Sequence, residues 1–120
     1  EYGKVYRNIR VEKDIPLDDA DIPPKIRIVV FRVLQEAMNN VARHSGADLA
    51  RISMRKNGDA IEFSVVDNGK GFDPIKMQKN RCGLGIAGMR ERVTFSQGLF
   101  SIESSEGSGT AIRITWPLNV

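Results

Sequence analysis

The chain has 120 residues, of which 41% are hydrophobic and 28% are charged, a balance typical of one globular domain. No apolar run approaches the roughly 20 residues that cross a bilayer, so no membrane-spanning helix and no membrane contact are expected. The net charge of +3 comes from scattered basic residues. This argues against a nucleic-acid interface and fits a domain that holds a polyphosphate.

The single cysteine, Cys82, excludes an internal disulfide and, beside only one histidine, argues against a structural zinc site. It fits a reducing compartment, so we expect a cytoplasmic domain, whose parent could still carry a membrane anchor. The chain begins at Glu1 without a methionine. We therefore expect a single domain, residues 1–120, that is a fragment of a longer protein.

The first predicted elements are a strand and a long helix. Residues 5–14 alternate loosely, which predicts a strand with one half-buried face. Asp21 is expected to cap the helix that follows, with prolines at its first positions. From Pro24 to His44 apolar residues recur at spacings of three and four, which predicts an amphipathic helix. Gly46 is suited to end it in a left-handed conformation.

Two hairpins and a second helix make up the rest of the chain. Residues 50–55 and 61–65 alternate on either side of Asn57-Gly58-Asp59, a strong hairpin signal. Residues 74–83 are expected to form a loop, and residues 84–95 a helix closed by Gly98. The last hairpin joins residues 100–102 to 112–116. The predicted fold is α+β, a two-layer α/β sandwich with a mixed, mostly antiparallel sheet and helices packed on one face.

Three glycine-bearing segments stand out as candidates for phosphate contact: residues 67–71, 83–88 and 107–110. Glycine lets backbone amides approach an anion closely, and the second segment opens a helix, whose first N–H groups favour negative charge. Residues 83–88 also match G-x-G-x-x-G, but no strand precedes them, so a dinucleotide-binding fold is rejected. The phosphate-loop pattern ending in Gly-Lys-Ser/Thr is absent from the sequence.

Glu36 and Asn40 are spaced four apart on the first helix, which places their side chains about 6 Å apart on one face. Mg²⁺ prefers oxygen ligands and keeps substrate phosphates in its shell. One amide oxygen facing a triphosphate suits that role, and the neighbouring carboxylate could take a proton or orient a water.

Gln35 to His44 resembles the N box of the GHKL superfamily, which comprises gyrase, heat-shock chaperone, histidine kinase and mismatch-repair ATPases. Asp67-x-Gly69-x-Gly71 resembles the adenine-recognition box of that superfamily. Gly83 to Ile86 and Gly109-Thr110 are similar to its later glycine boxes. The four motifs occur in the family's order and, with their flanking strands, cover nearly the whole chain. The resemblance implies the Bergerat-type ATP-binding fold and the cofactors ATP and Mg²⁺.

The resemblance also implies roles for individual residues. Asp67 would accept a hydrogen bond from the adenine amine, supported by Thr110, and Asn40 would bind Mg²⁺. Glu36 would be the candidate catalytic base or polarising group near the γ-phosphate. The other implied contacts to ATP come from basic side chains and from the glycine boxes, namely Arg43, His44, Gly69, Gly71, Lys76, Gly83, Leu84, Gly85, Ile86 and Gly109.

Glu36, together with Gly88 to Val93, resembles the nitrate-sensor-like subfamily of sensor histidine kinases. That resemblance implies transfer of the γ-phosphate to a histidine on a separate helical dimerisation domain of the same parent chain. The implied downstream partner is a response regulator with a helix-turn-helix output domain. His44, the single histidine, lies inside the nucleotide motif, so the chain itself should not phosphorylate itself on histidine.

Three other readings remain open from the residues. An anti-sigma-factor-like serine kinase shares the fold, although Gly88 to Val93 argues against it. An ATP-gated clamp would use Glu36 to activate water, but such proteins bring longer lids than the dozen residues available here. A nucleotide receptor without turnover is the third. Taken alone, Glu36 and Asn40 are also ordinary solvated helix positions, and Asp67 to Gly69 is an ordinary turn.

Overall fold

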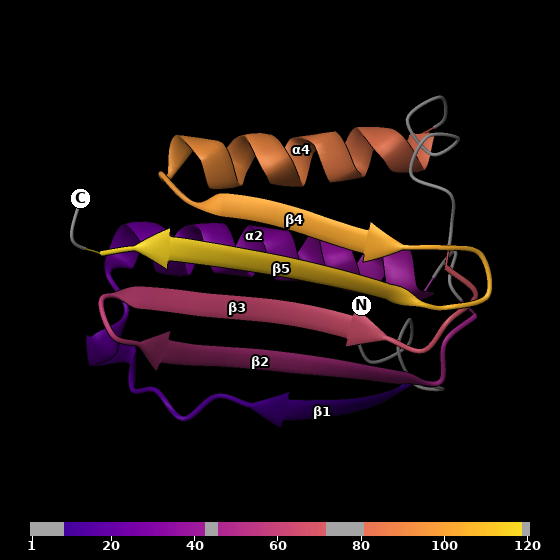
Figure 1. The fold of residues 1–120 in the computed structure, drawn as a ribbon, viewed down its shortest axis with the longest axis horizontal. Coiled ribbons are helices and arrows are strands. Elements are labelled where there is room, and N and C mark those ends of the chain that lie inside the picture. Colours follow the sequence, from indigo (N-terminus) through magenta and orange to yellow (C-terminus); the bar gives the residue numbers. More distant parts are fainter. Residues whose placement is uncertain (1–8, 43–45, 72–80, 119–120) are drawn as a thin grey trace.

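The computed structural model describes residues 9–42, 46–71 and 81–118, which form a five-stranded sheet with two α-helices on one of its faces (Figure 1). The strands lie in the order β1-β2-β3-β5-β4. No helix in these described ranges is long and apolar enough to cross a membrane. The elements are β1 (Arg10–Asp14), α2 (Pro24–Asn40), β2 (Leu49–Asn57), β3 (Ala60–Asp67), α4 (Arg81–Phe95), β4 (Leu99–Ser104) and β5 (Thr110–Pro117).

The sheet is mixed, as predicted. β1 pairs with β2 in parallel, whereas β2–β3, β3–β5 and β4–β5 are antiparallel. Alternate residues of β3 are buried, and the residues between them face outward, which reproduces the alternation seen in the sequence. The two-layer α/β sandwich predicted from the sequence is therefore confirmed.

The β2–β3 hairpin turns through Gly58 and Asp59, between the paired residues Asn57 and Ala60. Gly58 has φ +61°, a conformation that costs glycine little. The hairpin predicted from Asn57-Gly58-Asp59 is confirmed.

The prediction that Asp21 caps α2 is wrong. Pro23 occupies the N-cap with φ −54° and ψ 141°, without a side-chain cap, and Pro24 begins the helix. The pair of prolines holds Pro23 extended, because a residue that precedes proline is excluded from helical geometry. Asp21 instead ends a short 3₁₀ helix, where its Oδ2 accepts a hydrogen bond from the backbone N–H of Asp18 at 3.1 Å.

α2 differs from its predicted limits at its C-terminal end, and α4 differs at its N-terminal end. α2 ends at Asn40 and is followed by a wider turn at residues 41 and 42, and Gly46 has the expected positive φ of 66°. α4 begins at Arg81, within the segment predicted to be a loop, so Gly83 lies inside its first turn. At the C-terminal end of α4 the left-handed residue is Gln97, with φ 66°, and not Gly98.

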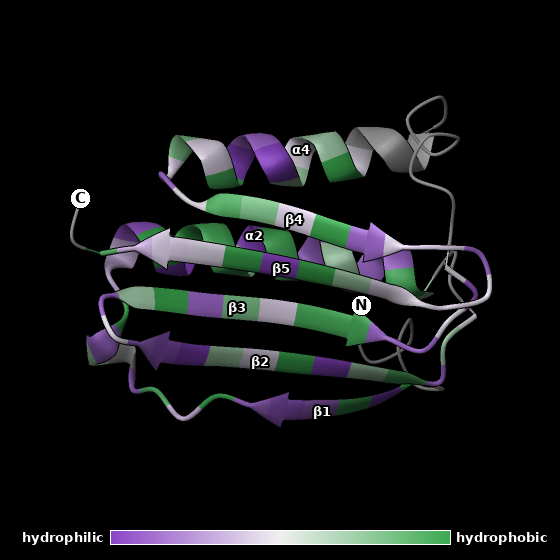
Figure 2. Cartoon of the chain, viewed as in Figure 1, coloured by the Kyte–Doolittle hydropathy of each residue, from purple (hydrophilic) through white to green (hydrophobic). Residues whose placement is uncertain are grey.

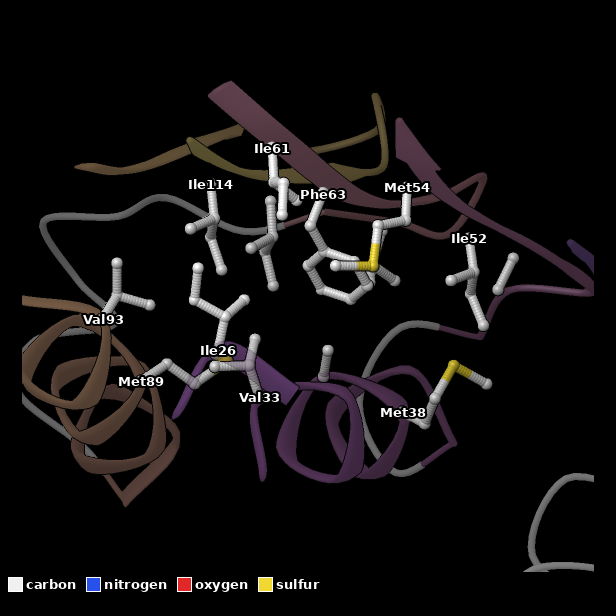
Figure 3. Close-up of a cluster of buried hydrophobic side chains, with 14 of the residues drawn as sticks. Ile26, Val33, Met38, Ile52, Met54, Ile61, Phe63, Met89, Val93 and Ile114 are labelled. Carbon is white, nitrogen blue, oxygen red and sulfur yellow. The ribbon is translucent and has the colours of Figure 1, made fainter. Parts of the chain in front are cut away.

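The core lies between the helices and the inner face of the sheet (Figure 3). α2 contributes one apolar stripe, including Ile26 and Val33, and α4 contributes Met89 and Val93. Figure 2 shows hydrophilic and hydrophobic residues alternating along the strands, which is the pattern of a sheet covered on one side. This core fixes α2 and α4 against the end of the sheet where the motif residues lie.

A buried hydrogen-bonded pair closes α4 against β5. The indole N–H of Trp116, a residue only 1% exposed, donates to Ser96 Oγ at 2.8 Å, and Ser96 Oγ donates to the carbonyl oxygen of Val93 at 2.8 Å. Gly98 packs on the same indole, where an added Cβ would lie 2.7 Å from Nε1. The Trp116 indole is thus both hydrogen-bonded by Ser96 and tightly packed against Gly98.

Replacing Ser96 with alanine is expected to lower the free energy of unfolding by about 1–3 kcal/mol, because the buried indole N–H loses its acceptor. Chemical denaturation followed by Trp116 fluorescence measures the change. Thr94→Ala is the control, because its exposed hydroxyl bonds Arg90 O and its loss should cost less than about 0.5 kcal/mol. Equal losses in the two variants would contradict this account.

Candidate functional site

Three polar side chains meet at one end of the sheet, on the face covered by the helices. Asp67 ends β3 and pairs with Thr110, the first residue of β5, and Thr110 pairs with Ser104, the last residue of β4. We call Asp67, Thr110 and Ser104 the polar rung. Asp67 is only 9% exposed, and Thr110 and Ser104 are half-buried. A hollow of about 510 Å³ at this end of the sheet is lined by these three residues and also by residues of the opposite face, namely Val66, Glu103, Ala111 and Arg113.

Asp67 is held by backbone amides. Its Oδ1 accepts a hydrogen bond from the N–H of Gly69 at 2.8 Å. Burial raises the pKa of the Asp67 carboxyl above its ordinary value, against the opposing effect of backbone N–H groups of Gly69 and Thr110. The Asp67 carboxylate is therefore buried at the end of β3 and bonded to the loop that follows it.

The raised pKa predicts a pH dependence of folding. When the folded pKa exceeds the unfolded one, the folded state holds the proton more tightly, so the contribution of Asp67 to stability rises as pH falls through the folded pKa. Consider the unfolding free energy of the original chain minus that of Asp67→Asn. This difference should increase as the pH is lowered from about 7 to about 4. Denaturant titrations across that range measure it, and a difference that shrinks with acid would contradict the direction.

Two glycines allow the backbone around the polar rung to close. Gly71 and Gly109 have φ of +68° and +75°. A Cβ on Gly109 would collide with the carbonyl oxygen of Asp67, and one on Gly71 would collide with Ser105 O and lie 2.8 Å from Gly109 O. The first and third glycine segments are therefore packed against each other.

Asn68 fixes the start of this loop, which the sequence alone did not indicate. Its Oδ1 accepts hydrogen bonds from the backbone N–H groups of Asp48 at 3.2 Å and Leu49 at 3.1 Å, and its Nδ2 donates to the Asp48 carboxylate at 2.7 Å. These bonds tie the end of β3 to the beginning of β2, and they hold the backbone on either side of Asp67.

A second group of motif residues lies between α2 and α4. A Cβ on Gly85 would lie 2.5 Å from Glu36 Oε2 and 3.0 Å from its Cδ, so the missing side chain of Gly85 is what admits the carboxylate. A hollow of about 330 Å³ lies here, lined by Arg32, Gln35, Glu36, Asn39, Gly85, Gly88, Met89 and Arg92. The N box and the second glycine box thus meet directly.

The other predicted residues fall in three places. Asn40 is half-buried in the last turn of α2 and does not line the hollow beside Glu36, whereas Asn39 does. Ile86 packs against the core, and Gly83 and Leu84 lie in the first turn of α4. The remaining three, Arg43, His44 and Lys76, lie outside the described residues.

The two groups lie toward the same end of the molecule. In Figure 1, the C-terminal end of α2, the N-terminal end of α4, the end of β3 and the start of β5 are all on the right-hand side. The strand ends that carry Asp67 and Thr110 therefore lie toward the same end of the molecule as the facing ends of α2 and α4. Arg32 and Arg92, to which the sequence analysis assigned no individual role, also line the hollow beside Glu36.

The oxygen atom available at the end of α2 would suit a magnesium ion whose other ligands come mainly from the phosphates of a bound substrate. Among the described residues, no group of three or more His, Cys, Asp or Glu is arranged to hold a metal ion. Mg²⁺ needs no such cage where one or two protein oxygens and a set of phosphates complete its shell. A single amide oxygen from the end of α2 is consistent with that kind of site.

A family model described as "Histidine kinase-, DNA gyrase B-, and HSP90-like ATPase" matches residues 26–120, which include every motif described above. The chain belongs to this ATPase family. The polar rung and the α2–α4 hollow both lie within the matched residues.

Relatives place this ATPase-family domain with the sensor histidine kinases. The chain is 35% identical, over 86% of its length, to the signal transduction histidine-protein kinase/phosphatase DegS of Bacillus subtilis (strain 168). It is 42% identical, over 73% of its length, to the sensor histidine kinase MctS of Rhizobium johnstonii. The chain spans 27% and 19% of the lengths of these relatives. It corresponds to the ATP-binding catalytic domain of such a kinase.

Solved structures confirm the ATPase-family fold. The histidine kinase domain of the Erythrobacter litoralis EL346 blue-light activated kinase matches 97% of this chain with a TM-score of 0.78 and 20% identity, over 55% of its own length. The Acinetobacter baumannii histidine kinase AdeS matches 99% of the chain with a TM-score of 0.74 and 19% identity, over 64% of its own length.

Proposed function

We propose that the polar rung binds the adenine of ATP. In this assignment the Asp67 carboxylate accepts a hydrogen bond from the exocyclic amine, and Thr110 supports it. Gly69, Gly71 and Gly109 shape the backbone around the base. The support is geometric: an almost fully buried carboxylate pairs across the strands with a half-buried threonine, and both residues lie on the inner face of the sheet.

The phosphates would extend from the rung toward the facing ends of α2 and α4. Unpaired N–H groups in the first turn of α4, which contains Gly83 and Leu84, favour negative charge there. Gly85 and Ile86 follow in the next turn. Arg32 and Arg92 add positive charge beside Glu36.

Asn40 would supply a protein oxygen to Mg²⁺, and the bound ion would neutralise charge on the β- and γ-phosphates. Arg43, His44 and Lys76 are assigned to the phosphates from the resemblance. Glu36 would orient or deprotonate the attacking group, since its carboxylate lies at the Gly85 helix turn.

We infer that the parent protein transfers the γ-phosphate of ATP to a histidine on a separate helical domain. The observation that carries this inference is the contact between Glu36 and Gly85, together with the position of the α2 C-terminal end and the α4 N-terminal end at the same end of the fold as the end of β3 and the start of β5 (Figure 1). Such transfer depends on positioning and charge neutralisation, which this arrangement supplies. The sequence segment Gly88 to Val93 favours the nitrate-sensor-like subfamily and a response regulator with a helix-turn-helix output domain.

The test is to incubate the full-length parent with γ-labelled ATP and determine the chemistry of the labelled protein. Acid-labile, alkali-stable label is expected, as for phosphohistidine. Label on serine would support a serine kinase instead, and release of free phosphate without labelled protein would support an ATPase clamp. The 120-residue chain alone should bind ATP and remain unlabelled.

Asn40→Ala is expected to weaken ATP binding at least tenfold in the presence of Mg²⁺, because the protein oxygen offered to the ion is lost. Calorimetric titration with and without Mg²⁺ should show that the variant loses the Mg²⁺-dependent part of the affinity. Asn57→Ala, at the far end of β2, is the control and should titrate like the original chain. An Mg²⁺ dependence that survives in Asn40→Ala would move the metal role elsewhere, with Asn39 the nearest alternative.

A further inference from the structure

The hydroxyl of Ser104, at the end of β4, contacts the backbone of Gly109 and the side chain of Thr110. Its Oγ lies 2.9 Å from the carbonyl oxygen of Gly109 and 2.9 Å from Thr110 Oγ1. A carbonyl oxygen can only accept, and a serine hydroxyl has one hydrogen, so the bond to Gly109 uses that hydrogen. Ser104 must then accept its second bond from Thr110. The single hydroxyl hydrogen of Thr110 therefore points toward β4.

This arrangement determines what the polar rung presents to a ligand. With its hydrogen committed to Ser104, Thr110 Oγ1 offers only lone pairs elsewhere. Asp67, opposite Thr110 in β3, also offers only lone pairs when it is ionised, and one of its oxygens already accepts from Gly69. Two neighbouring strands thus present hydrogen-bond acceptors side by side.

We propose that Ser104 is a positioning residue that locks the Thr110 hydroxyl as an acceptor and thereby selects a purine with an exocyclic amine over one with an exocyclic carbonyl. This inference rests on the proposed function, in which Asp67 and Thr110 face adenine. Guanine carries a carbonyl oxygen where adenine carries its amine. A threonine hydroxyl that is free to rotate can donate to that oxygen, whereas a locked one meets it with lone pairs.

The test compares the affinities of Mg²⁺-ATP and Mg²⁺-GTP for the 120-residue chain and its variants by calorimetric titration. Ser104→Ala should lower the ATP-over-GTP affinity ratio by about tenfold, largely by strengthening GTP binding. Ser104→Thr keeps the hydroxyl and should preserve the ratio. Ser104→Cys, which is nearly the same size but bonds weakly, should lower it and serves if the alanine variant does not fold.

A double-mutant cycle ties the effect to Thr110. Thr110→Val removes the hydroxyl, so Ser104→Ala should change the ratio no further in that background. Ser101→Ala, at an exposed position on the outer face of β4, should leave the ratio unchanged.

The outcomes separate this inference from the function on which it rests. If Ser104→Ala and Ser104→Cys bind both nucleotides more weakly but in an unchanged ratio, Ser104 is merely structural and the inference is overturned while adenine binding stands. If the original chain shows no preference for ATP, and Asp67→Asn changes nothing, the adenine assignment fails and the inference fails with it.

Discussion

Replacing Asp67 with asparagine is expected to weaken ATP binding by roughly a hundredfold, which corresponds to about 2–3 kcal/mol for a hydrogen bond to a charged group. Asparagine can still accept the hydrogen bond from Gly69 through its one oxygen. Its amide nitrogen then stands where the second carboxylate oxygen was, and presents a donor to the donor amine of adenine. Calorimetric titration of ATP into the two proteins measures the loss.

The folded domain should tolerate this substitution. The side chain keeps its shape, and removing a buried carboxylate relieves the desolvation that raises the Asp67 pKa. The unfolding free energy should therefore stay within about 1 kcal/mol of the original. Glu62→Gln, an exposed acid on the same strand, is the matched control for loss of one negative charge. If Asp67→Asn and Glu62→Gln bind ATP equally well, the base assignment is wrong.

The second large effect is expected from Gly85→Ala, which should lower phosphoryl transfer by the parent protein at least tenfold while ATP still binds. The added Cβ would lie 2.5 Å from Glu36 Oε2, so the carboxylate must leave its position. Misplacement of a reacting group by about 1 Å can cost a hundredfold in rate. Because the obstacle is the end of a flexible side chain, the fold should accommodate the methyl group.

Gly88→Ala is the comparison for Gly85→Ala. Gly88 lies about one helical turn further along α4 and lines the same hollow. Apart from the helix's own backbone, no atom of the described residues lies within 4 Å of a Cβ added there. Both variants should stabilise the helix by up to about 1 kcal/mol, because alanine replaces glycine. The rate of labelling from γ-labelled ATP should fall much further in Gly85→Ala than in Gly88→Ala. Equal rates would show that the position of Glu36 is unimportant for transfer.

Most of the fold could be predicted from the sequence. A helix or strand that is buried on one face has apolar residues at a regular spacing, and that spacing can be read in the sequence. The alternation in β3 and the three- and four-residue spacing in α2 both reappear as buried stripes. The helix ends were less predictable. The start of α2 is set by the restriction that Pro24 places on Pro23, and α4 starts at Arg81, inside a polar segment that gave no helical period.

The residues of the candidate site could be predicted where they belong to a short sequence motif. They could not be predicted where their role depends on contacts with distant segments. Asp67, Gly71 and Gly109 were indicated by sequence, and their contacts agree with the grouping. Ser104 and the Asn68 side chain were not, because their partners are defined by strand register and loop closure. Ser104 lies six positions before Thr110, and its pairing with Thr110 can be recognised only when the register of the β4–β5 hairpin is known.

The polar rung has a consequence for how the domain gains stability. Asp67 and Thr110 stand side by side only when β3 and β5 are paired in register, and Ser104 joins them only when β4 is also in place. An unfolded chain keeps none of this arrangement, so a nucleotide that uses it binds the native state alone. At a hundred times its Kd, such a ligand adds about 2.7 kcal/mol to the free energy of unfolding. A nucleotide bound at the polar rung would therefore also oppose separation of β3, β5 and β4.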